Sequence, residues 1–484
     1  LTGSGNLTKD GSGTVTLDGS NSYTGATSVL DGTLRAGNAT AFGGSHTLNV
    51  SSSGTLDLNG FNASFSSVAS SGAIDLNGAT LIVGADGSSS TIGGTIQGNG
   101  GLTKIGSGVL TLTGFNAYTG PTFVQGGTLR TAGANVLNSN GDFGLGAGAT
   151  FELSGFNQSV GSLSGSGSVI LGGNTLTVGA NNSSSAFGGA ISGSGGLVKT
   201  GSGSLFLQGT NTFTGGIGLL GGSLIGNSNS LRGNILNNGV LVFDQAAAGT
   251  HTGAISGTGS LTKTGGGDLT LIGPNSYTGG TLINAGSLIG TTSSLQGGIL
   301  NNSALTFDQS ADGIFNGFIA GSGTLTKLGA GNVTFNTANS FTGLTTIGQG
   351  TLTLANGGIP GSVTVDSQGT LAGNGTIGGS LTIGGGLFLS GVSNAANLSA
   401  IPSVNAFRRS AITTFAAGDA AALIVNGDLI ANTGSRLAFA VTPSGATPIL
   451  VNGRATLAGS RFDVTINDPN PSRNATYTAL KALG

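Results

Sequence analysis

The chain has 484 residues, a formal net charge of −2 and only 7% charged residues. This balance leaves no basic surface for nucleic acid, and the absence of cysteine excludes disulfides, thiol catalysis and thiolate metal sites. Glycine supplies 97 residues, about one in five. Such a composition also fits a disordered chain, but 37% hydrophobic residues in alternating segments argue for strands that bury one face.

The stretch 101–130 shows the unit from which most of the chain is built. It predicts a short strand ending in Lys104, a Gly-Ser-Gly turn, and an alternating strand over 109–113. An aromatic turn with Tyr118 follows, then a strand through Val124 and a Gly-Gly turn. Four further versions of this stretch occur along the chain.

The five copies keep a strict register. Their lysines are 95, 95, 64 and 64 residues apart, and an aromatic residue follows each lysine by 14 positions, with Asn two positions before it. The lysines are Lys9, Lys104, Lys199, Lys263 and Lys327, and the aromatic residues are Tyr23, Tyr118, Phe213, Tyr277 and Phe341. Two 95-residue modules therefore precede two 64-residue modules.

The strands are about four to six residues long, alternate with period two, and end in Gly, Asn or Ser. We predict an all-β fold, a right-handed parallel β-helix (β-solenoid) that buries Leu, Val, Ile and Phe and exposes Thr, Ser and Asn. A β-propeller or sandwich is the alternative. Modules of unequal length disfavour a propeller, whereas a solenoid tolerates added coils because only neighbouring coils touch.

Four segments are expected. Residues 1–356 form a β-helix of five repeat motifs, and residues 357–391 continue its coils. Residues 392–422 break the pattern and predict an irregular loop, and residues 423–484 return to strands.

The repeat and the end of the chain resemble the passengers of bacterial autotransporters, the type V secreted proteins. The repeat resembles the passenger-associated strand repeat, and the end resembles the capping region before the translocator. The motifs at that end are Val425-Asn426-Gly427-Asp428-Leu429, Val451-Asn452-Gly453-Arg454-Ala455-Thr456-Leu457 and Tyr477-Thr478-Ala479-Leu480. The resemblance implies a β-helix at the cell surface or outside the cell, with 423–484 as an autochaperone-like cap. It also implies a C-terminal translocator barrel as a partner, which this chain does not contain.

The sequence predicts no enzyme, no cofactor and no metal site. His46 and His251 are expected to be solvent-facing structural residues. Asp244 and Asp308 recur in Phe-Asp-Gln and are expected to cap turns, with a glycan-cleaving groove as the alternative. The repeat lysines and aromatic residues are expected to be structural, each lysine stem covering apolar turn residues while its ammonium lies in water.

Arg408 and Arg409 lie in the one segment that interrupts the solenoid. Loops on a rigid scaffold carry function more often than the scaffold itself. We expect an exposed loop without a specific role, with a contact or processing site as the alternative.

These observations predict a surface rod that mediates attachment or aggregation. The alternative is a self-assembling extracellular fibre, and a glycan-active β-helix enzyme is the weakest candidate. The expected partners are a host or neighbouring cell surface and other copies of the chain, and no nucleic acid.

Overall fold

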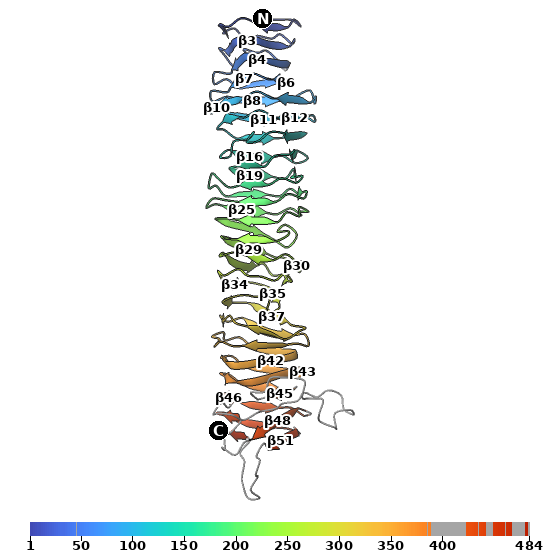
Figure 1. The fold of residues 1–484 in the computed structure, drawn as a ribbon, viewed down its shortest axis with the longest axis vertical. Coiled ribbons are helices and arrows are strands. Elements are labelled where there is room, and N and C mark those ends of the chain that lie inside the picture. Colours follow the sequence, from blue (N-terminus) through green and yellow to red (C-terminus); the bar gives the residue numbers. More distant parts are fainter. Residues whose placement is uncertain are drawn as a thin grey trace, which may run out of the picture. The chain divides into compact units, whose positions relative to one another are not determined.

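Short strands stacked coil upon coil form the chain in a computed structural model (Figure 1). The structure describes residues 1–44, 46–384, 386–388, 423–433, 435–441, 449–459, 461–466 and 480–482. Within these ranges there is no helix, so none is long and apolar enough to cross a membrane. The predicted all-β parallel solenoid is confirmed.

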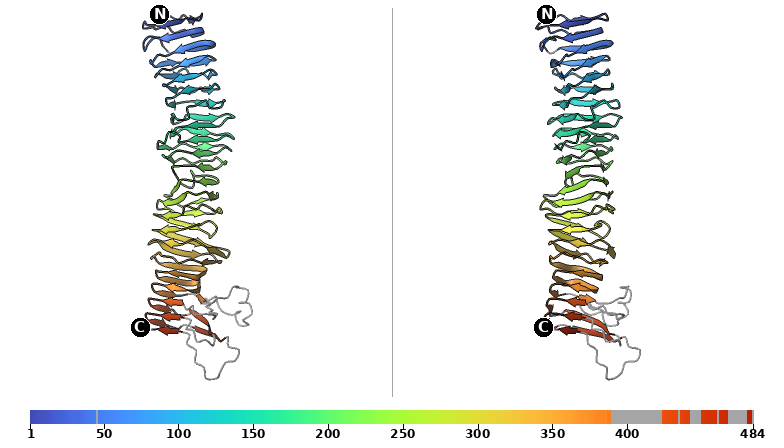
Figure 2. Two further views of the ribbon diagram at one scale, coloured as in Figure 1. Left: turned by 60° about the vertical axis from the view of Figure 1, so that its left-hand side comes forward. Right: turned by 90° about the vertical axis from the view of Figure 1, so that its left-hand side faces the viewer.

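The chain divides into two compact units, unit 1 (Leu1–Val242) and unit 2 (Phe243–Gly484). Figure 2 shows the stacked strands within each unit from two further directions. The division of the sequence at residues 356, 391 and 422 rests on repeat content and stays a prediction.

The strands of unit 1 form three stacks. The first contains β1 (Leu7–Lys9), β2 (Thr14–Leu17), β3 (Thr27–Ala36), β4 (Thr47–Asp57), β6 (Ser67–Ser70), β7 (Ala73–Asp75), β9 (Ser90–Ile92), β10 (Ile96–Gly98), β12 (Val109–Leu112), β13 (Ala117–Tyr118), β15 (Thr128–Thr131), β17 (Thr150–Leu153), β20 (Ser168–Ile170) and β23 (Ile191–Ser192). The second contains β5 (Ala63–Phe65), β8 (Thr80–Val83), β11 (Gly101–Lys104), β14 (Thr122–Val124), β16 (Asp142–Leu145), β19 (Ser162–Gly165), β22 (Ser185–Phe187), β25 (Ser204–Leu207) and β27 (Ser223–Gly226). The third contains β18 (Gln158–Val160), β21 (Leu176–Val178), β24 (Leu197–Lys199), β26 (Ile217–Leu219) and β28 (Ile235–Asn237). β29 (Val240–Asp244) includes the boundary between the units.

The strands of unit 2 follow the same pattern. One stack contains β32 (Ser260–Thr264), β34 (Thr281–Ile283), β36 (Ile299–Asn301) and β39 (Ile319–Ala320), and β31 covers Ile255–Ser256. The other sheet contains β30 (Gly249–His251), β33 (Leu269–Leu271), β35 (Ser287–Gly290), β37 (Ala304–Asp308), β38 (Gly313–Phe315), β40 (Thr324–Leu328), β41 (Asn332–Phe335), β42 (Thr345–Ile359), β43 (Val363–Ile377), β44 (Leu381–Ile383), β45 (Gly386–Phe388), β46 (Leu423–Val425), β47 (Leu429–Ala431), β48 (Arg436–Val441), β49 (Ile449–Val451), β50 (Ala455–Leu457), β51 (Arg461–Ile466) and β52 (Leu480–Ala482).

The core is a set of apolar columns that run from coil to coil. Leu110 pairs with Leu129, which pairs with Phe151, and each coil therefore takes about 20 residues. All three side chains are fully buried, whereas Val109 beside them is half-buried and faces outward. Each buried side chain of this size contributes about 1.5–3 kcal/mol through removal of apolar surface from water.

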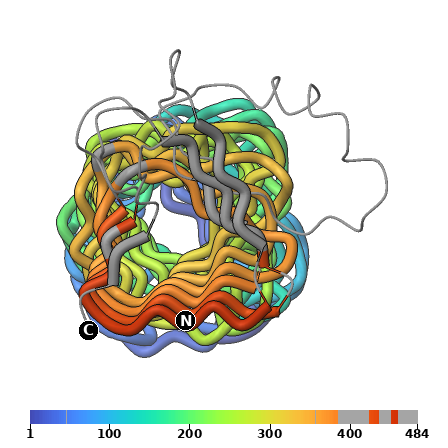
Figure 3. The backbone as a smooth tube through the Cα atoms, turned by 90° about the horizontal axis from the view of Figure 1, so that it is seen from below, coloured from blue at the N-terminus to red at the C-terminus, as the bar shows by residue number. Residues whose placement is uncertain are grey.

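Glycine is required where the coils turn. Gly106 has φ +64°, a conformation that side chains other than glycine rarely adopt. A Cβ built on Gly106 would lie 1.9 Å from the carbonyl oxygen of Gly84 on the preceding coil. Close stacking of backbone on backbone at the corners explains the high glycine content, and Figure 3 shows the overlying coils seen end-on.

In unit 2 the strands after residue 422 pair with the coils before residue 389. Thr376 of β43 pairs with Ile424 of β46, so parallel pairing resumes directly on the earlier coil. The stretch 389–422, with Arg408 and Arg409, lies outside the described residues.

Candidate functional site

The lysine of each repeat lies inside its coil. The five side chains expose only 0–5% of their surface. The Lys104 ammonium donates to the carbonyl oxygens of Ile105 (2.6 Å), Gly106 (2.8 Å) and Gly126 on the next coil (3.2 Å). An ammonium carries three N–H donors, so these three carbonyls satisfy it completely. The same arrangement surrounds Lys9, Lys199, Lys263 and Lys327.

The expectation that these ammonium groups lie in water is wrong. The turn after each lysine folds back over the ammonium, because the glycine two positions on adopts positive φ, as Gly106 does. Burial lowers the pKa of Lys104, Lys199 and Lys263, and lowers that of Lys327 to about 8. A charge so enclosed by backbone carbonyls holds the turn together and is closed to a ligand.

The lysines also lie on different sheets. In unit 1, Lys9 belongs to the first stack, Lys104 to the second and Lys199 to the third. In unit 2, Lys263 and Lys327 again lie in two different sheets. The repeat therefore builds local coil geometry, and its copies do not line up in one continuous stripe.

In four of the five repeats, the asparagine before the aromatic residue links three successive coils as a rung. Asn116 accepts a hydrogen bond from the backbone N–H of Ile96 (2.8 Å) and donates to the carbonyl of Val136 (2.8 Å). Asn211, Asn275 and Asn339 repeat this pattern with their own neighbours. The side-chain amide replaces a peptide in the ladder at positions where the strand is broken.

The repeat aromatic residues are buried, and each tyrosine has a threonine partner four residues on. The hydroxyls of Tyr118 and Thr122 lie 2.6 Å apart, and Tyr23 and Tyr277 make the same pair with their own threonines. Burial raises the pKa of Tyr118 and of Tyr277 to about 12.

Two copies carry phenylalanine in place of this tyrosine. Phe213 is followed four residues later by Ile217, so both hydroxyls are lost together. Phe341 is followed by Thr345, whose buried hydroxyl has no hydrogen-bond partner in the described part of the chain. In the last copy the tyrosine is therefore replaced by phenylalanine while its threonine partner is retained.

Both histidines are buried, which corrects the expectation that they face solvent. His46 and His251 are 3% and 2% exposed. His46 donates from Nδ1 to the carbonyl of Gly44, and its Nε2 lies 2.7 Å from the hydroxyl of Thr27, which in turn contacts Tyr23. Burial lowers the pKa of His46, so the ring is neutral and its tautomer is fixed by these contacts.

Asp244 and Asp308 do not form the carboxylate pair that the glycan-cleaving alternative requires. They lie on different sheets, in β29 and β37. The turn-capping role expected of them is also wrong. Asp244 accepts a hydrogen bond from the hydroxyl of Thr264 (3.2 Å), and Asp308 accepts none within the described residues.

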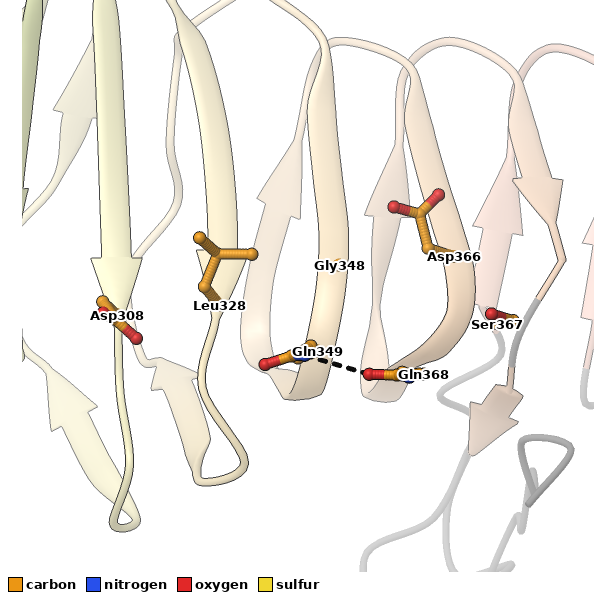
Figure 4. Close-up of a pocket in the computed structure, with 7 residues that line it drawn as sticks. All are labelled: Asp308, Leu328, Gly348, Gln349, Asp366, Ser367 and Gln368. Carbon is orange, nitrogen blue, oxygen red and sulfur yellow. Dashed lines mark hydrogen bonds between the residues drawn. The ribbon is translucent and has the colours of Figure 1, made fainter. Parts of the chain in front are cut away.

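The described part of the chain holds no cluster of three His, Asp or Glu side chains that could bind a metal ion. It does contain an open hollow on the outward face of unit 2, of about 730 Å³ (Figure 4). We call it the Gly348 hollow. Its lining residues are Asp308, Leu328, Gly348, Gln349, Asp366, Ser367 and Gln368.

Strand register explains why the hollow forms. Asp308 is paired with Leu328 on the next coil. Gly348 and Asp366 directly follow the paired Ile347 and Val365, at the point where the register shifts between Ile347 and Gln349. Gly348 has no side chain, and a Cβ there would lie 2.9 Å from Leu328 Cδ2 and 3.8 Å from Asp366 Oδ2. At the rim the Gln349 amide donates to the Gln368 amide oxygen (2.9 Å).

The preceding repeat carries different side chains at the equivalent positions. We define the earlier short module as residues 244–307 and the later short module as residues 308–371, which correspond at a spacing of 64 residues. Thr264, Asn284 and Asn302 of the earlier short module stand where the later short module has Leu328, Gly348 and Asp366. Sequence reasoning missed the hollow because it compared the residues that the repeats share. The signal lay in the positions at which they differ.

Comparison with known proteins agrees with this architecture. The passenger-associated-transport-repeat family matches residues 7–36, 102–130, 197–225, 261–289 and 321–354. The chain is 32% identical over 374 residues to "Adhesin BmaC autotransporter" of Brucella suis biovar 1 (strain 1330), an alignment that covers 66% of this chain and 11% of that protein. It is 31% identical over 266 residues to "Uncharacterized lipoprotein YdeK" of Escherichia coli (strain K12), covering 52% of this chain and 20% of that protein. No solved structure matches the chain significantly.

A parallel solenoid with five such repeats defines the class of molecule as a repeat-built passenger. These five repeats and the similarity to an autotransporter adhesin support an autotransporter passenger, which places the chain at the cell surface or outside the cell. It spans about a tenth and a fifth of the length of these two relatives.

Proposed function

We propose that this passenger is an adhesive surface protein without enzymatic activity, which mediates attachment to a host or neighbouring cell. The observation that carries the proposal is the distribution of polar side chains between the interior and the surface. The charged repeat residues are buried and satisfied, so the outward face consists mainly of threonine, serine, asparagine and scattered apolar side chains. Such a face suits many weak polar contacts, and similarity to an autotransporter adhesin supports the same role.

Attachment of beads coated with the purified chain tests this function. We expect coated beads to bind cultured cells more than beads coated with heat-unfolded chain, because the contacts depend on the registered coil surface. Equal binding of both bead types would contradict the proposal.

Self-association is a second candidate, favoured by exposed apolar side chains. Phe115 in unit 1 and Ile272 in unit 2 are 65% and 62% exposed. With few charges to repel a second copy, such residues favour lateral contact. We expect sedimentation of the chain to show concentration-dependent assemblies that Phe115→Ser and Ile272→Ser weaken. A monomer at every concentration would exclude this function.

A further inference from the structure

The Gly348 hollow is built by a local departure from the repeat. Gly348 does not have positive φ, and a Cβ there would first meet the flexible end of Leu328 at 2.9 Å. The backbone therefore accepts a side chain at this position, as the earlier short module accepts Asn284. The hollow at this position is shallow and widely open to solvent, as a site on the side of a solenoid would be.

The carboxylates of the hollow can still accept hydrogen bonds. The carboxylates of Asp308 and Asp366 make no hydrogen bond or ion pair with the described residues. The nearby Lys327 ammonium donates to three backbone carbonyls and forms no ion pair with either carboxylate, although the charge of Asp308 partly offsets the lowering of its pKa by burial. The hollow thus offers strong acceptors to a ligand that brings its own donors.

The spacing of these acceptors argues against a single metal ion. Asp308 and Asp366 are three coil steps apart, about 14 Å at the usual spacing of paired strands. Two carboxylates at that separation cannot bind one ion. They suit an extended ligand that lies along the stack and presents several donors.

The remaining lining suits a sugar. Leu328 is 37% exposed and presents an apolar surface to the C–H face of a ring. The Gln349–Gln368 pair leaves one amide oxygen and one amide nitrogen for hydroxyl groups, which both donate and accept. Ser367 also lines the hollow.

We propose that the Gly348 hollow binds a neutral oligosaccharide laid along the coils, with sugar hydroxyls donating to Asp308 and Asp366 and a ring resting on Leu328. This inference rests on the adhesive function proposed above and names its ligand class.

A panel of immobilised neutral oligosaccharides, including hexamers of β-linked glucose, mannose and N-acetylglucosamine, tests the inference with the purified chain. Gly348→Asn and Leu328→Thr restore the residues of the earlier short module. The first adds a side chain to the hollow, and the second removes the apolar surface proposed to carry the sugar ring. Asp366→Asn weakens one acceptor, and Asp244→Asn is the matched control on the other sheet. Unfolding midpoints of all variants check that the coils are intact.

We expect binding of at least one hexamer by the unmodified chain. Gly348→Asn and Asp366→Asn should each weaken it by about tenfold, the loss expected when a hydrogen-bonded contact is removed. Asp244→Asn should leave it unchanged. Absence of binding to every sugar would overturn the inference, and so would binding that Gly348→Asn does not alter. Binding of poly-lysine but of none of the sugars would also overturn it, because the carboxylates would then serve a cationic partner.

The bead assay separates this inference from the proposed function. If coated beads attach to cells although the chain binds no sugar, the sugar-binding inference is contradicted and the adhesive function is retained. Sugar binding without bead attachment would do the reverse.

Discussion

The earlier and later short modules have the same interior and different exteriors. Lys263 and Lys327 sit in identical carbonyl enclosures, and Asn275 and Asn339 form the same rung. Outside, Asn284 gives way to Gly348 and a hollow opens. The coil tolerates substitutions where a side chain faces outward. Comparison of the two modules therefore separates the residues that form the coil from the residues that give each surface its own character.

One interior position breaks the symmetry. Tyr277 and Thr281 share a hydrogen bond in the earlier short module, whereas Phe341 leaves the hydroxyl of Thr345 alone. The interior is therefore less uniform than the repeat pattern suggests.

The largest loss of stability is expected from substitution of the buried lysines. Lys263→Met and Lys327→Met each leave three enclosed carbonyls without a donor, at a cost of about 3 kcal/mol or more. Hydrogen exchange of the backbone amides in the affected coils should accelerate by the same factor in both modules. The exposed Asn284→Ala is the control and should change little. A protected coil in either methionine variant would show that the ammonium is dispensable there.

The second prediction concerns pH. Burial lowers the pKa of Lys327 from 10.5 to about 8. Between these values the unfolded chain binds more protons than the folded one, so the free energy of unfolding should rise as pH increases from about 8 to 10.5. Urea midpoints across this range measure the effect, and Lys327→Met should flatten the profile. A midpoint that falls over this range would mean that the carbonyls hold the proton more strongly than burial expels it.

A smaller loss is expected at the asparagine rungs. Asn275 bonds its neighbours at 2.8 and 2.6 Å, and Asn339 at 2.9 and 3.3 Å. Asn275→Ala should cost about 2 kcal/mol, and Asn339→Ala less, because its donor bond is already long. Hydrogen exchange at Ile255 and Ile319, whose N–H groups lose their acceptor, reports the difference directly. Equal losses would show that bond length does not set the strength of a rung.

The smallest change in stability is expected from Thr→Val substitutions, and its sign should differ between the two modules. Thr281→Val removes a buried hydrogen bond from Tyr277 and should destabilise the chain by about 1 kcal/mol. Thr345→Val removes only an unsatisfied hydroxyl and should stabilise it by about 1 kcal/mol. Thermal unfolding of the two variants tests the contrast. Destabilisation by both would mean that Thr345 does find a partner in solution.

The fold was predictable because its determinants are local and repeated. Alternation in segments such as 109–113, with glycine at the turns, predicts parallel coils with no need of distant information. The regular spacing of the lysines then confirms one structure for all copies. Residues 389–422 carry no such pattern, and the expectation of a contact or processing site at Arg408 and Arg409 stays a prediction.

The site was harder to predict because it depends on which side chains face one another across coils. Lysine usually keeps its ammonium in water, and only the geometry of the turn around Gly106 shows that here it does not. The pairing of Asp308 with Leu328, and the gap at Gly348, likewise depend on coil length to the residue. A shift of one residue would turn each of these side chains to the other face.

Module length and coil length are out of step. A coil takes about 20 residues, and neither 95 nor 64 residues is a whole number of coils, which is why Lys9, Lys104 and Lys199 fall on three different sheets. Duplication of a module therefore rotates its copy about the axis. A folding chain that slips by one coil therefore never pairs one repeat with another, and this mismatch of lengths favours the correct register. The same mismatch places successive copies of a module on different faces of the solenoid.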